Sequence, residues 1–582
     1  MTMQFTDRSD DVLRAVEELG LFRVPRRIES SEFADAAVLA GEISIVDHEA
    51  TLWLVLDSSF PLTLPRFFLR PWDVLGVIPH VDRHGMVCFA DPEGLVLDRH
   101  RPVQVVQEAF ERAIHVLTDG VVGRNRTDFA DEFEAYWCQL PGIISGDSVL
   151  APADEVTRVI IATDEAKKII VAGSESDLSA FYNGADVAGK YTFLQKALYL
   201  PLEYGMPVVP PRHDGPFWSA KEARRTLLAA VSRANKVQLK KLLKRRPHKR
   251  EYVIVKLPRP SGGATLFGIQ YDGVGHHHPL HKDGIASCLV PLRLQRLDRG
   301  YLVQRGGGVA ELGAKRVLLV GCGAVGGPLV FELARAGVLH LTLVDDDILI
   351  PENSFRHVLG RRYWRRRKVE ALKEEIESAL PYVQVTALSS TIEKALAEGS
   401  IQLSDYDLLV LAMGNPTVEL EINAQVHALR GGPATVFTWL EPLGIGGHAL
   451  LTRNAPGGGC FECLYTSPAG NEELQANRAA FAAPGQSFGR ALSGCGSLYT
   501  PYGAMDAART AAMAARLAVD ALTGKEPGNP LLSWKGDAAD FLAEGFRLSP
   551  RFRVTEDDLR RHRYAYRSTR CGICNAQEEK AS

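Results

Sequence analysis

A glycine-rich turn in the second half of the chain is suited to binding a phosphate. The sequence Gly-Cys-Gly-Ala-Val-Gly-Gly occupies 321–327 and follows an apolar stretch at 317–320 that is expected to form a strand. Glycines let the backbone turn tightly and approach a nucleotide, and the N-terminus of a helix expected over 328–336 favours negative charge. Alone, the turn does not separate ATP sites from NAD or FAD sites.

The side chains after this turn indicate ATP chemistry. A second expected strand leads into three acids, and an amide and two cations follow: Asp345, Asp346, Asp347, Asn353, Arg356 and Lys368. A dehydrogenase does not need these cations. An enzyme that splits ATP at the α-phosphate must neutralise charge on both AMP and the departing pyrophosphate. We therefore expect an ATP site that activates a carboxylate.

This order of residues resembles the ThiF/MoeB and ubiquitin-activating-enzyme superfamily over roughly residues 310–580. The resemblance implies a Rossmann-like α/β adenylation domain at 310–582 that binds ATP and Mg²⁺. It places the nucleotide on Gly321, Gly323 and Gly326, the ribose on Asp345, and the phosphates on Asn353, Arg356 and Lys368, with Arg356 also catalytic. An ordinary nucleotide-binding fold with surface charges is the alternative.

One position departs from the family pattern. After the expected strand at 407–412, the family usually has an aspartate that binds magnesium, but here the sequence is Met413-Gly414-Asn415-Pro416. Gly414 takes the place of the acid. Asp347 or a different acid is therefore expected to hold the metal.

Two Cys-x-x-Cys pairs predict a zinc centre. Cys460 and Cys463 form one pair, and Cys571 and Cys574 form the other. Four thiolates suit tetrahedral zinc, and the resemblance implies a structural Zn²⁺ in the adenylation domain. Redox pairs usually stand alone, and disulfides are not expected because 1–11 is acidic and lacks the pattern of a secretion signal.

Among the other five cysteines, Cys495 has surroundings that suit acyl transfer. It lies in Ser-Gly-Cys-Gly-Ser at 493–497, after a stretch rich in glycine and alanine. Ubiquitin-activating enzymes carry their acyl-transfer cysteine on such a segment, so the resemblance makes Cys495 the candidate nucleophile. An inert loop cysteine is the alternative.

The amino-terminal region resembles a ubiquitin-conjugating domain over about residues 5–145. In that family an asparagine stands eight residues before the catalytic cysteine and a glycine three before it; here His80, Gly85 and Cys88 fall at those places. We expect an α+β domain at 1–145 in which Cys88 accepts an acyl group. An imidazole N–H of His80 can donate to an oxyanion as the asparagine does. A buried cysteine beside a histidine is the alternative.

The interval 146–309 is expected to be an α/β adaptor region. Strand patterns occur at 158–162, 168–171, 252–256 and 264–268, with a helical span near 220–244. A basic stretch at 240–250 is expected to be a solvated helix face rather than a nucleic-acid site. Four histidines between 276 and 281 could bind metal, but we expect no acidic or cysteine partner with suitable spacing nearby and therefore a polar loop.

The 582 residues suffice for several domains, and a net charge of −3 with 46% hydrophobic residues gives no general attraction to nucleic acid or membrane. Apolar stretches such as 435–451 are broken by Gly and Pro, so a cytoplasmic protein is expected.

A conjugating domain that precedes an activating domain resembles the fused protein of bacterial CBASS antiphage systems. The resemblance implies that a protein C terminus is adenylated, captured by Cys495, passed to Cys88 and joined to an amine. It further implies a homodimer, with a cGAS/DncV-like nucleotidyltransferase as the substrate. A sulfur-carrier adenylyltransferase of cofactor biosynthesis and a non-catalytic scaffold stay open as alternatives.

Overall fold

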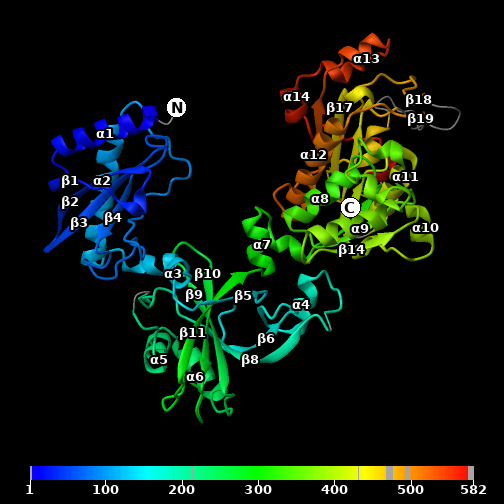
Figure 1. The fold of residues 1–582 in the computed structure, drawn as a ribbon. Coiled ribbons are helices and arrows are strands. Elements are labelled where there is room, and N and C mark those ends of the chain that lie inside the picture. Colours follow the sequence, from blue (N-terminus) through cyan, green and yellow to red (C-terminus); the bar gives the residue numbers. More distant parts are fainter. Residues whose placement is uncertain are drawn as a thin grey trace. The chain divides into compact units, whose positions relative to one another are not determined.

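The computed structural model describes residues 3–574, except 188, 207, 213–214, 430, 456, 467–475 and 492–497. The chain forms two compact units (Figure 1). One contains residues up to 175 and 188–297, and the other contains 176–187 and the residues from 298 onward.

The first unit begins with an antiparallel sheet of four strands in the order β1-β2-β3-β4. The strands are β1 (Arg23–Arg27), β2 (Ala36–Ile45), β3 (His48–Asp57) and β4 (Arg66–Arg70). Helices α1 (Met3–Glu18) and α2 (Pro102–Val122) contact this sheet. The apolar residues of α2 recur at helical spacing and are buried: Val106, Ala109, Ala113 and Leu117. They share a core with alternate residues of β3, so one face of the sheet is covered.

A closed barrel of seven strands forms the rest of the first unit, in the order β10-β11-β5-β7-β6-β8-β9. The strands are β5 (Ile144–Ser148), β6 (Thr157–Thr163), β7 (Ile169–Ala172), β8 (Thr192–Pro201), β9 (Arg250–Pro258), β10 (Ala264–Asp272) and β11 (Cys288–Arg296). The helices α3 (Phe129–Trp137), α5 (Ala220–Ala229) and α6 (Arg233–Leu242) accompany them. Trp137 and Phe133 of α3 pack on Phe267 of β10. The sequence pattern predicted strands here but not their closure into a barrel.

The second unit contains a seven-stranded sheet in the order β14-β13-β12-β15-β16-β17-β20. The strands are β12 (Arg316–Val320), β13 (His340–Val344), β14 (Gln384–Leu388), β15 (Leu408–Leu411), β16 (Ala434–Leu440), β17 (Gly446–Thr452) and β20 (Leu531–Lys535). The first five in this order are parallel, and β17 pairs antiparallel with β16 and β20. Alternate residues of β12 join two different cores, as expected for a strand buried on both faces.

Helices cover both faces of this sheet. Residues of α8 (Gly326–Ala336), α9 (Lys368–Ala379) and α12 (Ala504–Leu522) belong to one core, and residues of α10 (Ile392–Ala397) and α11 (Pro416–Ala428) belong to the other. The remaining elements are α4 (Glu175–Phe181), α7 (Arg299–Arg305), α13 (Ala539–Ala543), α14 (Glu556–Arg561), β18 (Arg490–Ala491) and β19 (Leu498–Tyr499). Because β12 lies between β13 and β15, the sheet has its topological switch point there, where open α/β sheets bind ligands.

Across the described part of the chain, no helix has both the length and the apolar character needed to cross a membrane.

Candidate functional site

A cavity of about 840 Å³ lies at this switch point. Its lining includes the residues that directly follow β12, β13 and β15, so it opens at the carboxyl ends of these strands. Six of the residues expected to bind ATP line it: Gly321, Gly323, Asp345, Asp347, Arg356 and Lys368. Gly326 and Asn353, the other two, do not line the cavity but lie on the adjoining backbone.

Two glycines of the turn are required by close backbone contacts. Gly321 has a φ of +89°, and a Cβ there would lie 2.7 Å from the backbone of Ala412. A Cβ on Gly326 would lie 1.8 Å from the carbonyl oxygen of Gly321. A Cβ on Gly323, in contrast, would meet nothing within 4 Å, so this glycine faces open space that a nucleotide can enter.

The acids after β13 are held by the backbone and by a lysine. Asp345 accepts hydrogen bonds from the backbone N–H groups of Cys322 at 2.7 Å and Asp347 at 2.8 Å. The Nζ of Lys368, the first residue of α9, lies 2.6 Å from Oδ2 of Asp347. Lys368 is only 7% exposed, so its ammonium group is held at the cavity wall by an ion pair.

Arg356 and Asn353 have different surroundings. The Arg356 guanidinium lies 5.4 Å from the ring centre of Tyr502 and 5.9 Å from that of Tyr499. These are cation–π distances, and they connect a cavity cation to the stretch that follows 492–497. Oδ1 of Asn353 accepts a hydrogen bond from the N–H of Ile350 at 3.1 Å, which closes a short helical turn. Asn353 therefore shapes the loop that carries Arg356.

Glu419, in the first turn of α11, lines the same cavity and was missed in the sequence. It is only 2% exposed, and burial raises its pKa to about 8, while the backbone N–H groups of Gly414 and Met413 lower it. Glu419 was missed because the family pattern places the acid at position 414, where this chain has glycine. The signal that could have revealed it is a glutamate on the buried face of the next helix.

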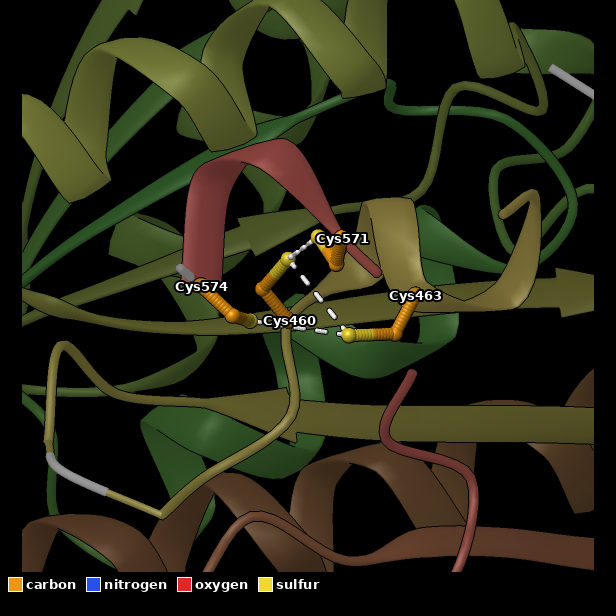
Figure 2. Close-up of side chains that lie close together, drawn as sticks. All are labelled: Cys460, Cys463, Cys571 and Cys574. Carbon is orange, nitrogen blue, oxygen red and sulfur yellow. Dashed lines mark hydrogen bonds between the residues drawn. The ribbon is translucent and has the colours of Figure 1, made fainter. Parts of the chain in front are cut away.

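The four cysteines of the two Cys-x-x-Cys pairs converge on one buried site (Figure 2). The Sγ of Cys460 lies 4.0 Å from that of Cys463 and 3.6 Å from that of Cys571, and the Sγ atoms of Cys463 and Cys574 are 3.5 Å apart. Tetrahedral zinc with bonds of about 2.3 Å separates its sulfurs by about 3.8 Å, whereas a disulfide needs about 2 Å. These distances and the all-thiol donor set fit Zn²⁺.

Cys88 is exposed in the loop region between β4 and α2. Its backbone N–H donates a hydrogen bond to the carbonyl oxygen of His80 at 2.8 Å. Although the residue is exposed, protein encloses part of the thiol, and this desolvation, with the charges of Glu132 and Asp82, raises the pKa of Cys88 to about 11. A thiol in this state is protonated at neutral pH.

Two carboxylates hold the His80 ring. Its Nδ1 lies 2.6 Å from Oε1 of Glu132, and its Nε2 lies 3.0 Å from Oδ2 of Asp128. The backbone N–H of His80 also donates to Oε2 of Glu132 at 2.9 Å, and His80 has a left-handed φ of +67°. Hydrogen bonding to Glu132 is the main cause that raises the pKa of His80 to about 9. In this arrangement both ring nitrogens are engaged, so neither N–H points to an oxyanion at Cys88.

Three other cysteines and the histidine loop also stand out in the sequence. Cys495 lies outside the described residues; Cys322 is buried and Cys288 is exposed. The expectation that the histidine loop has no acidic partner was wrong, because Oδ2 of Asp283 lies 3.7 Å from Nδ1 of His281.

Comparisons with known proteins agree with this two-part organisation. Residues 299–540 match the ThiF family, and residues 35–141 match prokaryotic E2 family B. The ATP-dependent ubiquitin transferase-like protein Cap2 of Pseudomonas aeruginosa (strain BWHPSA011 / Pa011) is 26% identical over 496 residues, which cover 81% of this chain and 84% of the relative. Cap2 of Escherichia coli (strain TW11681) is 23% identical over 584 residues, covering 93% and 92%.

A third relative matches a smaller share of the chain. The adenylyltransferase and sulfurtransferase UBA4 of Yarrowia lipolytica (strain CLIB 122 / E 150) is 29% identical over 182 residues, which cover 31% of this chain and 44% of the relative. The predicted resemblance to fused conjugating and activating proteins is confirmed: a region that matches prokaryotic E2 family B precedes a region that matches the ThiF family in this one chain.

Proposed function

We propose that this chain uses ATP to activate the C-terminal carboxylate of a partner protein and then transfers the acyl group through two cysteines to an amine. The observation that carries the proposal is the presence, in one chain, of a ThiF-type cavity with two cations and an exposed cysteine in an E2-like domain. The Cap2 relatives support the same two activities.

In the first step, a carboxylate oxygen of the partner attacks the α-phosphorus of ATP. The bond between the α-phosphorus and the bridging oxygen breaks, and pyrophosphate leaves with the electron pair. Lys368 and Arg356 line the cavity and neutralise charge that grows on the phosphates. Mg²⁺, when bound, would supply further neutralisation of the pyrophosphate. Lys368 would exchange its pairing with Asp347 for a phosphate oxygen.

The later steps exchange one acyl bond for another. The Cys495 thiolate attacks the carbonyl carbon of the acyl-adenylate, and AMP leaves. The Cys88 sulfur attacks the new thioester and loses its thiol proton, and the Cys495 sulfur leaves and takes up a proton. An acceptor amine then attacks the Cys88 thioester, loses a proton and releases the thiolate. Thioesters retain reactivity toward amines, which explains why both carriers are cysteines.

The zinc centre would have a structural role. Cys460 and Cys463 precede α12, whereas Cys571 and Cys574 follow α14, so one bound Zn²⁺ would join segments that are far apart in the sequence. Such a site stabilises the fold and leaves no open position for catalysis.

We propose a cGAS/DncV-like nucleotidyltransferase of an antiphage system as the partner protein, because the order of the two matched domains resembles that of the fused protein of CBASS systems. We also propose a homodimer. Four apolar side chains are exposed between residues 348 and 358, beside Arg356, and burial against a second copy would remove them from water: Ile348, Ile350, Phe355 and Val358.

A sulfur-carrier adenylyltransferase is the second candidate function, because the UBA4 relative is named an adenylyltransferase and sulfurtransferase. It would need the ATP cavity and the zinc centre but not Cys88. Trapping of intermediates separates the two candidates. With Cys88→Ala, a reductant-sensitive adduct is expected on Cys495 without transfer to an amine.

With Cys495→Ala, acyl-adenylate should form but no thioester. Cys288→Ala, which removes an exposed cysteine of the barrel, is the matched control and should behave as the unmodified protein. Loading of Cys88 at the normal rate in Cys495→Ala would disprove the two-cysteine relay.

A further inference from the structure

The acids around the ATP cavity differ in their free capacity to bind a cation. Asp347 is paired with Lys368, which neutralises its charge. Both oxygens of Asp345 accept backbone hydrogen bonds. Glu441 is 4% exposed and accepts hydrogen bonds from the backbone N–H groups of Phe481 and Ala482. These three acids already have internal partners.

Glu419 is different. Its side chain lines the cavity, is only 2% exposed, and its Oε1 is buried without a hydrogen-bond partner. A buried carboxylate oxygen without a partner is costly, so it calls for a ligand. Backbone N–H groups of Gly414 and Met413 hydrogen-bond the Glu419 carboxyl group but leave Oε1 without a partner, whereas both oxygens of Glu441 accept a hydrogen bond.

Glu419 lies close to the place where the family's aspartate, absent at Gly414, would project. Gly414 follows β15 directly, and a Cβ built on it would meet nothing within 4 Å, so open space lies where an aspartate would project. Glu419 comes one turn later, on α11, and lines the cavity beside Gly414. Its side chain is one methylene longer than that of aspartate, which suits an approach from the helix.

We propose that Glu419 replaces the missing aspartate and supplies the protein carboxylate that binds the Mg²⁺ of MgATP. This inference rests on the proposed function of the cavity and names a residue for it. Magnesium is typically held by one or two protein carboxylates together with phosphate oxygens and waters, so one unpartnered glutamate oxygen at the cavity wall suffices.

The test measures binding rather than turnover. The probe is the α,β-methylene analogue of ATP, which cannot be split at the α-phosphate, titrated calorimetrically into the full chain with Mg²⁺ or with EDTA. Mn²⁺ binding to the same complex is measured by electron paramagnetic resonance. In Glu419→Gln, we expect affinity for the metal to fall on the order of tenfold or more, while binding of the analogue in EDTA is unchanged.

Glu421→Gln is the matched control. Glu421 lies on the same helix, is exposed and accepts a hydrogen bond from Gln425 at 2.9 Å, so Glu421→Gln makes the same chemical substitution without touching the cavity. Adding Gly414→Asp to Glu419→Gln should restore metal affinity, because the space at 414 is open and aspartate tolerates a left-handed φ better than most residues.

The outcomes separate this inference from the proposed function. Failure of the unmodified protein to bind the analogue would overturn both. Binding with the same Mg²⁺ and Mn²⁺ dependence in Glu419→Gln and in the unmodified protein would overturn only the role of Glu419. If circular dichroism shows that Glu419→Gln does not fold, Glu419→Asp keeps the charge but shortens the side chain, and unchanged Mn²⁺ affinity in that variant would equally overturn it.

Discussion

Replacing Glu132 with glutamine is expected to lower the pKa of His80 and to loosen the loop that presents Cys88. Glu132 contacts both the ring and the backbone N–H of His80, and the carbonyl oxygen of His80 accepts the hydrogen bond from the N–H of Cys88. The titratable groups that face the ring come from two elements: Asp128 from the 3₁₀ turn before α3, and Glu132 from α3. Tyr136 donates to Glu132 at 3.3 Å.

The size of the effect follows from the pKa of His80. A pKa raised from the ordinary value of 6.5 to about 9 corresponds to ~3 kcal/mol of stabilisation of the protonated folded form. The folded pKa lies above the unfolded one, so this contribution is complete below pH 6.5 and is lost as the pH rises through about 9. Glu132 makes the largest contribution to the raised pKa, so Glu132→Gln should remove most of it.

Hydrogen–deuterium exchange at the imidazole carbon, followed by mass spectrometry across pH, measures the pKa of individual histidines in the full chain. We expect a value near 9 for His80 in the unmodified protein and a value at least one unit lower in Glu132→Gln. Tyr136→Phe is the control, since it removes only a hydroxyl from Glu132, and should change the pKa much less. A pKa near 6.5 in the unmodified protein, or no change in Glu132→Gln, would refute the reasoning.

Three further predictions concern the second unit. Lys368→Met should abolish partner-dependent ATP–pyrophosphate exchange, because it removes a buried cation and leaves Asp347 unpaired; Lys394→Met, at an exposed lysine of α10, is the control, and normal exchange in Lys368→Met would exclude the phosphate role. Gly326→Ala should lose nucleotide affinity and stability on the order of 1–3 kcal/mol, because its Cβ would lie 1.8 Å from the Gly321 carbonyl oxygen; an unchanged melting temperature and affinity would contradict this steric argument. Cys571→Ser should reduce the zinc content from about one ion per chain to well below one in elemental analysis. If the unmodified protein, purified without a chelator, contains no zinc, the zinc centre is refuted.

Much of the adenylation domain can be predicted because its signals are local in the sequence. The apolar stretch at 317–320 lies in β12, and the expected helix at 328–336 lies in α8, which begins two residues earlier at Gly326. Glycine turns, acids after a strand and paired cysteines each depend on spacings of a few residues, and the structure brings them to one cavity and one cluster.

Long-range pairing is harder to predict. The barrel closes because β11 pairs in parallel with β5, although more than a hundred residues separate them. Local patterns in each strand carry no record of that partner. The same limit applies to His80, whose ring is engaged by carboxylates 48 and 52 residues later. The oxyanion role expected for His80 rested on an analogy with the family's asparagine. Nothing in the sequence indicated the two carboxylates that engage its ring.

Glu419 could be predicted only in part. Its signal is local in the sequence, but it appears only when residues 416–428 are treated as a helix with one buried face. The buried residues of α11 recur at helical spacing and mark one face: Glu419, Ile422, Asn423, Val426 and His427. The polar members of such a face need a reason to be buried. The Oδ1 of Asn423 has one, since it accepts from the N–H of Phe461 at 3.1 Å, although the Nδ2 of Asn423 is buried without a partner; His427 contacts the carbonyl oxygen of Asn423. Oε1 of Glu419 has no comparable partner. A glutamate that lines the cavity with one carboxyl oxygen buried and unpartnered, one turn after a strand that lacks its expected acid, is therefore better explained by a ligand than by packing.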